Sequence, residues 1–309
     1  MGEDKRHFVL IHGACHGAWC WYKVASLVKS AGHQVTALDM AASGIHPTQV
    51  RELNSITQYF EPLMEFMASL ASEERIILVG HSFGGVAISV AMENFPNKIA
   101  AAVFVTALMP APDLSFVTLL HEIHVVSGGR DGVIVPIIGQ TNPKHQLQIA
   151  GSEHRIQLLS PSSGCAIPEV FRLESDELDT QRIFDEGLND HPNGSHLFGP
   201  RFLASNLYQL SPVEDLTLAM SLVRPARLYG DEERLREETK VTWDNYGTVA
   251  KVYVVCEQDK ALKPDFQLSM VERNPTKDVK VIAEADHMPM FSKPQELFAH
   301  LQDIAKTYY

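Results

Sequence analysis

The pentapeptide GHSFG at residues 80–84 joins two apolar segments of different period. Residues 75–80 form a short, nearly continuous apolar run, as in a strand that is buried on both faces. Residues 85–92 have helical spacing instead. A G-x-S-x-G sequence between a strand and a helix predicts a sharp turn, the nucleophile elbow, with its serine on a strained backbone. Its glycines let the two backbones approach where a Cβ would clash. The sequence therefore predicts a strand–turn–helix unit with Ser82 at the turn.

Apolar strands and amphipathic helices alternate on both sides of this unit. The short apolar runs that we interpret as strands are residues 7–12, 34–39, 75–80, 99–106, 250–256 and 279–283. The segments with helical spacing are residues 21–31, 55–70, 83–94, 265–272 and 295–308. Solidly apolar strands separated by helices are typical of a parallel sheet that is covered on both faces. The sequence therefore predicts an α/β protein with a mostly parallel sheet and helices on both faces.

The alternation stops between residues 109 and 224. This segment is rich in Pro, Gly, His and Ser, and only parts of it, such as residues 211–223, have helical spacing. A chain of 309 residues, of which 45% are hydrophobic, has ample length for one large domain with an insertion. We therefore predict a core made of residues 1–108 and 225–309, with residues 109–224 inserted as a cap.

Charge and cysteine content narrow the class of protein. The net charge of −12 argues against nucleic acid and anionic membranes as main partners. We find no signal-peptide core and no apolar run long enough for a membrane span. The four cysteines form no C-x-x-C pair, and no cluster has metal-ligand spacing. We therefore expect a cytoplasmic protein with reduced thiols and no metal or other cofactor.

Ser82 is the candidate nucleophile, although a serine at this point can also simply cap the following helix. A serine hydroxyl needs a base within hydrogen-bond reach. Among 14 histidines, His287 is distinguished by its place in a loop between the last predicted strand and the last helix. Such loops lie at the carboxyl ends of parallel strands, where the turn at Ser82 also points. We predict that His287 is the base.

The third member of a catalytic triad must orient the imidazole and stabilise its protonated form. Asp259 follows the predicted strand 250–256, which gives the chain order Ser, Asp, His that is expected for such a sheet. Glu257, Asp286 and Asp39 are the alternatives. Glu257 lies closer to the strand, Asp286 adjoins His287 in sequence, and Asp39 ends an earlier strand. We predict Asp259 and keep Asp39 as the weaker alternative.

An oxyanion hole requires two backbone N–H groups that point at the developing charge. We expect the first from Phe83, directly after the candidate nucleophile, and the second from Ala14, in the loop GACHGAW at residues 13–19. In the same loop, Cys15 and His16 either line the substrate pocket or only pack the loop. The sequence leaves these two possibilities open.

The chain resembles the plant methylesterase and hydroxynitrile lyase family of α/β-hydrolases over most of its length. The motifs that carry the resemblance are HGACHGAW at 12–19, GHSFGG at 80–85, FGPRFL at 198–203, LYQL at 207–210, SLVRP at 221–225, VVC at 254–256 with Asp259, DHM at 286–288 and KP at 293–294. The resemblance implies an α/β-hydrolase fold and hydrolysis of the methyl ester of a hormone or alkaloid intermediate, without a cofactor. Family members are often dimers, so it also implies a homodimer that acts on a small-molecule ester.

Positions around the predicted triad separate the branches of this family. Hydroxynitrile lyases carry a threonine after the first-loop histidine and a lysine after the catalytic histidine, where this chain has Gly13 and Met288. Without that lysine, expulsion of cyanide loses its main electrostatic support. A third branch, the methylketone synthases, departs from the triad that Ser82 and Asp259 complete here. The resemblance thus favours an esterase.

The residues that we expect to line the substrate pocket are Gly13, Cys15, His81 and Met288. The chain departs from the family in the cap. Residues 118–177 are more numerous than in the relatives and include SGGRDG at 127–132 and PSSG at 161–164. Because the cap lines the pocket for the acyl group, this departure from the family bears on the identity of the ester substrate.

Overall fold

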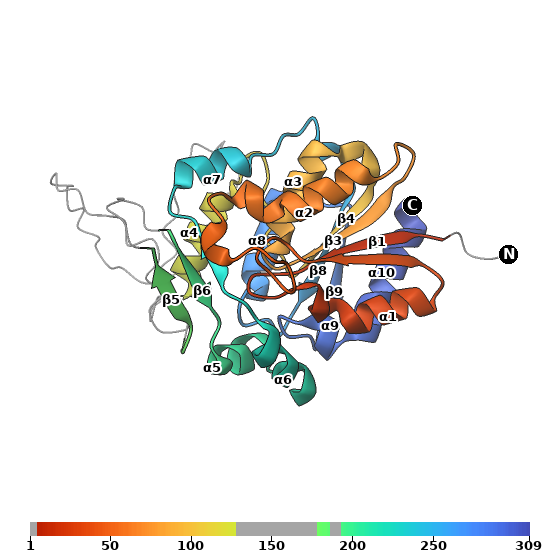
Figure 1. The fold of residues 1–309 in the computed structure, drawn as a ribbon. Coiled ribbons are helices and arrows are strands. Elements are labelled where there is room, and N and C mark those ends of the chain that lie inside the picture. Colours follow the sequence, from red (N-terminus) through yellow and green to blue (C-terminus); the bar gives the residue numbers. More distant parts are fainter. Residues whose placement is uncertain (1–4, 128–177, 186–192) are drawn as a thin grey trace, which may run out of the picture.

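The computed structural model describes residues 5–127, 178–185 and 193–309 (Figure 1). It contains a six-stranded sheet in the order β2-β1-β3-β4-β8-β9, and every neighbouring pair is parallel. The strands are β1 (His7–Ile11), β2 (Gln34–Leu38), β3 (Ile76–His81), β4 (Ile99–Val105), β8 (Lys251–Cys256) and β9 (Asp278–Ile282). Each of these strands begins and ends within two residues of the run predicted from the sequence.

Helices cover both faces of this sheet, as the α/β fold class requires. They are α1 (Tyr22–Ser30), α2 (Ile56–Ser69), α3 (Gly84–Asn94), α8 (Pro264–Arg273) and α10 (Pro294–Tyr308). Shorter helical turns are η1 (Ala18–Trp21), η2 (Val50–Glu52), η3 (Pro96–Lys98), η5 (Tyr246–Thr248) and α9 (Pro289–Ser292). The predicted mostly parallel sheet with helices on both faces is confirmed.

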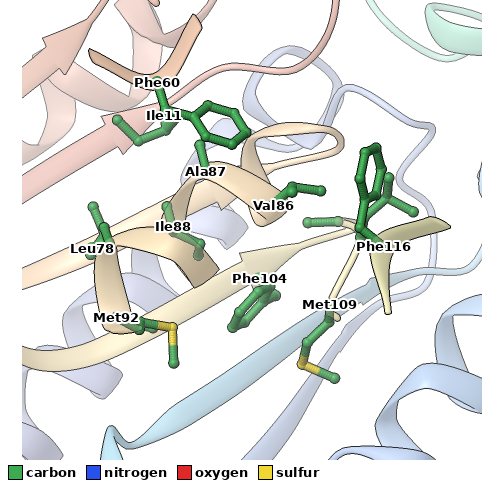
Figure 2. Close-up of a cluster of buried hydrophobic side chains, with 14 of the residues drawn as sticks. Ile11, Phe60, Leu78, Val86, Ala87, Ile88, Met92, Phe104, Met109 and Phe116 are labelled. Atoms are coloured by element: carbon green, nitrogen blue, oxygen red, sulfur yellow. The ribbon is translucent and has the colours of Figure 1, made fainter. Parts of the chain in front are cut away.

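Alternate residues of the strands pack into two separate apolar clusters. On one face, Leu78 and Phe104 pack with side chains of α2 and α3, such as Phe60 and Val86 (Figure 2). On the other face, Val79 and its neighbours pack with α1 and α10. All residues of β1, β3, β4 and β8 are buried. Burial on both faces explains why these strands have continuous apolar runs rather than an apolar–polar alternation.

A second, antiparallel sheet lies between β4 and β8 in chain order, at the carboxyl ends of the core strands (Figure 1). Its strands, in the order β5-β6-β7, are β5 (Gln181–Phe184), β6 (Gly194–Leu197) and β7 (Ala226–Leu228). Further helices of this part of the chain are α4 (Phe116–Ser127), α5 (Pro200–Phe202), the π-helix η4 (Leu203–Leu207), α6 (Val213–Leu222) and α7 (Glu232–Glu238). None of these three strands is among the strands predicted from the sequence.

The predicted division into core and cap stays a prediction. The six-stranded sheet uses residues on both sides of the predicted insertion, while β7 lies just beyond residue 224 and pairs with β6. The extra cap segments, at 127–132 and 161–164, lie almost wholly outside the described residues. Among the described helices, none is long and apolar enough to cross a membrane.

Candidate active site

Ser82 lies on the sharp turn between β3 and α3, with a backbone φ of +53°. A Cβ at Gly80 would lie 2.8 Å from the carbonyl oxygen of Gly84, and one at Gly84 would lie 2.7 Å from that of His12. Only glycine fits at both positions, because the strand, the helix and the first loop meet here. The Ser82 carbonyl accepts hydrogen bonds from the N–H groups of Gly85 and Leu108, both at 3.0 Å. The turn thus holds the Ser82 side chain at the carboxyl end of the sheet.

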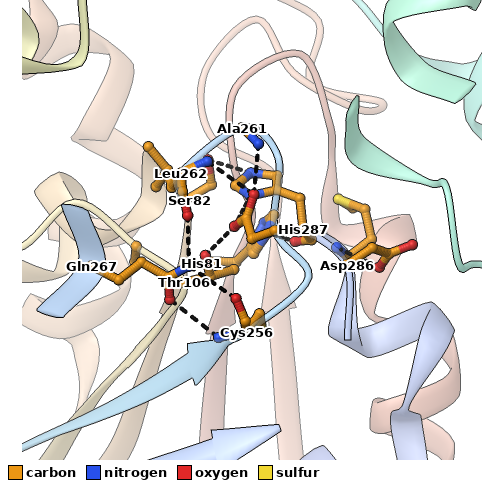
Figure 3. Close-up of polar contacts among 12 residues, drawn as sticks. His81, Ser82, Thr106, Cys256, Ala261, Leu262, Gln267, Asp286 and His287 are labelled. Carbon is orange, nitrogen blue, oxygen red and sulfur yellow. Dashed lines mark hydrogen bonds and ion pairs between the residues drawn. The ribbon is translucent and has the colours of Figure 1, made fainter. Parts of the chain in front are cut away.

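Two other strand ends bring Asp259 and His287 to this serine. Figure 3 shows Ser82 and His287 among the polar contacts of this region. His287 Nε2 lies 3.0 Å from Ser82 Oγ, and His287 Nδ1 lies 2.7 Å from Asp259 Oδ2. His287 is 4% exposed and Asp259 is 3% exposed, so water is largely excluded from the hydrogen bond between them, while Ser82 is half-buried. The structure therefore brings together the three side chains that the sequence analysis assigned to a triad.

The partners of the imidazole fix its tautomer. Asp259 accepts, so Nδ1 of His287 carries the proton and Nε2 is left with a lone pair that faces the Ser82 hydroxyl. This is the tautomer in which the ring can take the proton of the serine. The arrangement is competent for general-base activation of Ser82.

The Asp259 carboxylate is held by four donors. Its Oδ1 accepts from the N–H groups of Ala261, at 2.7 Å, and Leu262, at 2.9 Å. Its Oδ2 accepts from the Thr106 hydroxyl as well as from His287. Hydrogen bonds to the charged form stabilise a buried carboxylate. Asp259 is therefore fixed in position and orientation toward the imidazole.

The three alternatives to Asp259 point elsewhere. Glu257 is exposed. Asp39 accepts from the N–H groups of Ala18, at 2.6 Å, and Ile45, at 3.1 Å. Asp286 is fully buried, and its side chain is directed away from Ser82 and Thr106 (Figure 3). Among these four carboxylates, only Asp259 is hydrogen-bonded to the His287 ring within the described residues.

The backbone N–H groups of Ala14 and Phe83 have no hydrogen-bond partner among the described residues. Phe83 directly follows the nucleophile, and Ala14 directly follows Gly13, where a Cβ would lie 2.8 Å from Ser82 Cβ. The peptide that carries the Ala14 N–H is held from its other end. The Gly13 carbonyl accepts from His12 Nδ1 at 2.8 Å and from the His16 N–H at 3.4 Å. Hydrogen bonds to a carbonyl polarise the N–H of the same peptide. The arrangement is suited to an oxyanion hole, which stays a prediction for these two residues.

The histidines around this loop are neutral. Burial lowers the pKa of His12, and it lowers the pKa of His16 to about 3. Burial, reinforced by the nearby His287, also holds the pKa of His81 well below its ordinary value. His12 accepts from the Met40 N–H at 3.1 Å through its unprotonated Nε2. These rings therefore act as fixed hydrogen-bonding groups and not as cations.

The four predicted pocket residues occupy different places, and their role in substrate binding stays a prediction. A Cβ at Gly13 would lie 2.8 Å from Ser82 Cβ, so this glycine directly adjoins the nucleophile. His81 is buried and donates from Nε2 to the His287 carbonyl at 2.7 Å. Cys15 has φ +63°, and burial raises its pKa to about 12. Met288 is fully buried. Cys15 is therefore a protonated thiol, and His81 supports the loop of the base.

Thr106 is a site residue that the sequence analysis missed. It directly follows β4, the neighbour of β3, and so lies at the same sheet edge as Ser82. A polar residue at the end of an apolar run was the available signal. Among the described residues, no three His, Cys, Asp or Glu side chains converge as metal ligands would.

Several known proteins are similar to this chain over nearly its whole length. The model of the alpha/beta hydrolase family matches residues 8–301. Methyl jasmonate esterase 1 of Vitis vinifera is 48% identical over 308 residues, which cover 100% of both chains. The crystal structure of polyneuridine aldehyde esterase superimposes with a TM-score of 0.78 at 36% identity and covers 98% of this chain and 100% of its own. Tomato methylketone synthase I complexed with 2-tridecanone gives a TM-score of 0.79 at 40% identity, covering 99% and 100%.

Proposed function

The chain belongs to the plant methylesterase family of α/β-hydrolases, and on that premise we propose that it hydrolyses the methyl ester of a small, largely apolar plant metabolite. The observation that supports this proposal most is the hydrogen-bonded chain Asp259–His287–Ser82. The N–H groups of Ala14 and Phe83, which have no hydrogen-bond partner among the described residues, add to it. The metabolite is a hormone or an alkaloid intermediate, and the reaction needs no cofactor.

In the first half of the reaction, Ser82 Oγ attacks the ester carbonyl while His287 Nε2 takes the hydroxyl proton. The carbonyl oxygen becomes an oxyanion that accepts from the N–H groups of Ala14 and Phe83. Loss of one such donor typically costs about 10²–10³ in rate. Asp259 stabilises the protonated imidazole. His287 then returns the proton to the methoxy oxygen, the C–O bond breaks, and methanol leaves an acyl group on Ser82.

In the second half, water takes the place of methanol. His287 removes a proton from the water as it attacks the acyl carbonyl, and the same two N–H groups hold the second oxyanion. Collapse of this intermediate breaks the bond to Ser82 Oγ, which recovers its proton from His287. The products are the free carboxylic acid and the unchanged enzyme.

Hydrolysis is favoured over the lyase reaction by the side chains next to the nucleophile and the base. Met288 is fully buried beside His287 and is uncharged, so it offers no cation to a departing cyanide. A side chain at position 13 would press on Ser82, because its Cβ would lie 2.8 Å from Ser82 Cβ. A methoxide leaving group needs only the proton that His287 holds.

A panel of methyl esters and cyanohydrins with product detection tests this proposal. Methyl jasmonate is the first ester to include, because the grape relative is a methyl jasmonate esterase. We expect methanol and the free acid from at least one ester, and no cyanide from mandelonitrile-type compounds. Cyanide release by the wild type at a rate comparable to ester hydrolysis would favour the lyase instead.

We also propose that the protein is a cytoplasmic homodimer. Three cysteines of the described residues, Cys15, Cys20 and Cys256, are buried free thiols, which is compatible with a reducing compartment. Fractionation of the source tissue and light scattering of the purified protein test the compartment and the assembly separately. A secreted protein or a monomer would contradict the respective part.

A further inference from the structure

Four consecutive residues at 208–211, here called the bridging segment, contact all three loops that carry the candidate site. The segment follows the π-helix η4 and precedes α6, so it belongs to the part of the chain outside the six-stranded sheet. None of its residues lies in the triad or in the predicted pocket. Its contacts run separately to the loop at residues 13–19, here called the oxyanion loop, to the loop of Asp259 and to the loop of His287.

The first contact reaches the oxyanion loop. Tyr208 Oη lies 2.7 Å from His16 Nε2, and the two rings stack with an interplanar angle of 15°. His16 Nδ1 in turn lies 2.9 Å from the Ala14 carbonyl oxygen. A carbonyl only accepts, so Nδ1 carries the proton and Nε2 accepts from the Tyr208 hydroxyl. Tyr208 therefore locks the tautomer of His16, which fixes the main chain at Ala14.

The second contact reaches the loop of the candidate acid. The side-chain amide of Gln209 donates to the carbonyl of Gln258 at 2.7 Å. Gln258 directly precedes Asp259, and its own N–H donates to the Ala285 carbonyl at 3.0 Å. This contact therefore holds the loop of Asp259 at the point where it also joins the loop of His287.

The third contact reaches the loop of the base through Asp286. Oδ2 of this fully buried carboxylate accepts from the Leu210 N–H at 2.9 Å and the Ser211 hydroxyl at 2.8 Å. Oδ1 accepts from the Met288 N–H at 2.9 Å and the Ser292 hydroxyl at 2.8 Å. One oxygen thus faces the bridging segment and the other faces its own loop. The four donors satisfy the charge without any cation among the described partners.

We propose that residues 208–211, together with Asp286 and His16, position the catalytic groups by tying the three loops to one another. Asp259 and His287 both lie on loops beyond strand ends, and loops are the more mobile parts of a fold. A misplacement of about 1 Å at a reacting group costs about 10²-fold in rate. The proposal rests on the function proposed above, because it concerns how the same site is aligned. Tyr208, Ser211 and Asp286 are thus positioning residues and not catalytic ones.

Two conservative variants test the segment. Tyr208→Phe removes the hydroxyl that locks His16, and Ser211→Ala removes one donor to Asp286. For each we expect kcat to fall about tenfold while KM changes less than about twofold, because alignment and not substrate binding is affected. The rate at which a fluorophosphonate labels Ser82 should fall by the same factor. Ser211→Thr, which keeps a hydroxyl, should restore most of the loss.

A third variant, Asp286→Asn, keeps the shape of the side chain and disrupts one end of the bridge. Whichever way the amide is turned, its NH₂ faces a backbone N–H, that of Leu210 or that of Met288. We expect a loss of kcat of about 10²-fold, larger than for the other two variants. If this variant does not fold, Tyr208→Phe and Ser211→Ala still decide the question.

Matched controls remove similar hydroxyls that touch none of the three loops. Tyr22→Phe deletes a hydroxyl that donates to Asp215 on α6 at 2.8 Å, and Ser221→Ala deletes one that donates to the Thr217 carbonyl within α6. Both should keep kcat and the labelling rate within about twofold of the wild type. Thermal melting of all variants shows which fraction is folded at the assay temperature.

The proposal is overturned if Tyr208→Phe and Ser211→Ala are folded at the assay temperature and keep wild-type kcat and labelling rates. It is also overturned if the controls lose as much activity as these two variants. Failure of the proposed function is a separate result. If fluorophosphonate labels wild-type Ser82 but no methyl ester is hydrolysed, the esterase proposal fails, while the labelling rates of the variants still decide on the bridging segment.

Discussion

The loops at the carboxyl edge of the six-stranded sheet and the three-stranded sheet of the predicted cap differ in how firmly they are held. At the sheet edge, Asp259 has four hydrogen-bond donors and is 3% exposed. Every residue of β4, which ends there, is buried. In the small sheet, β5 leaves Ile183 65% exposed and Phe184 46% exposed.

Because of this difference, we expect one region to determine the rate of the reaction and the other to determine which substrate is bound. The chemistry depends on distances near 3 Å between groups from three strand ends, and such distances persist only in a closely packed surrounding. The outer strand of the small sheet, β5, is largely exposed, and this sheet lies at the carboxyl ends of the core strands (Figure 1). Substitutions in the loops at the carboxyl ends of the core strands should therefore change kcat. Substitutions in the small sheet should change KM and the preference among esters.

Apart from removal of the nucleophile itself, the largest effect is expected for Asp259→Asn. The amide cannot hold the His287 tautomer that leaves Nε2 free, so kcat should fall by up to about 10⁴-fold. Steady-state kinetics on the best methyl ester measure this loss. A mild effect would show that another carboxylate, Asp39 or Glu257, supports the base.

A second substitution at the sheet edge, Gly13→Thr, tests the space around the nucleophile. Because the new Cβ would lie 2.8 Å from Ser82 Cβ and 3.1 Å from His81 Nδ1, the first loop or the elbow must shift. We expect kcat/KM to fall by about 10²-fold. Gly32→Ala is the control, since Gly32 has φ +85° and no atom within 4 Å of a built Cβ. The Gly32→Ala substitution should strain the backbone and leave kcat/KM unchanged. A fully active Gly13→Thr variant would contradict the close contact between the first loop and Ser82.

Acid should lower the free energy of unfolding because of three buried histidines near the nucleophile. Burial lowers the pKa of His12, His16 and His81, so from the ordinary pKa near 6.5 downward the unfolded chain binds protons that the folded chain does not. The contribution of these histidines to the free energy of unfolding is therefore fully present above pH 6.5. It falls as the pH falls below that value, by up to about 1.4 kcal/mol per pH unit for each histidine.

Urea unfolding at pH 7.5 and 5.5 measures this slope. His16→Gln should unfold with a smaller pH dependence than the wild type. An equal free energy of unfolding at both values would contradict the neutral, buried state of these rings.

The smallest effect is expected in the cap. Asp179 accepts from the N–H groups of Arg201, at 2.9 Å, and Phe202, at 3.0 Å, and so caps α5 beside the small sheet. Asp179→Ala should destabilise the start of α5 by about 1 kcal/mol. We expect KM to rise severalfold and fluorophosphonate labelling of Ser82 to stay unchanged. A fall in kcat and in the labelling rate would instead contradict the expectation that this part of the chain affects only substrate binding.

The sequence alone was sufficient to predict features that depend on neighbouring residues or on the order of elements along the chain. The core strands, the elbow and the loops of Asp259 and His287 follow from apolar runs and from chain order. Thr106 was missed because its partner, Asp259, lies 153 residues away, and the contact of Tyr208 with His16 spans 192 residues. The strands of the small sheet have three or four residues, too few for an alternation to be recognised.

The most direct test of the account is to trap the acyl-enzyme. Wild-type protein is mixed with the best methyl ester, quenched in acid within the first turnovers and digested, and the peptides are weighed by mass spectrometry. We predict that the peptide with Ser82 gains the mass of the ester minus methanol, and that Ser82→Ala shows neither this adduct nor methanol release. Methanol release by Ser82→Ala at a near wild-type rate, or an adduct on another residue, would contradict the account.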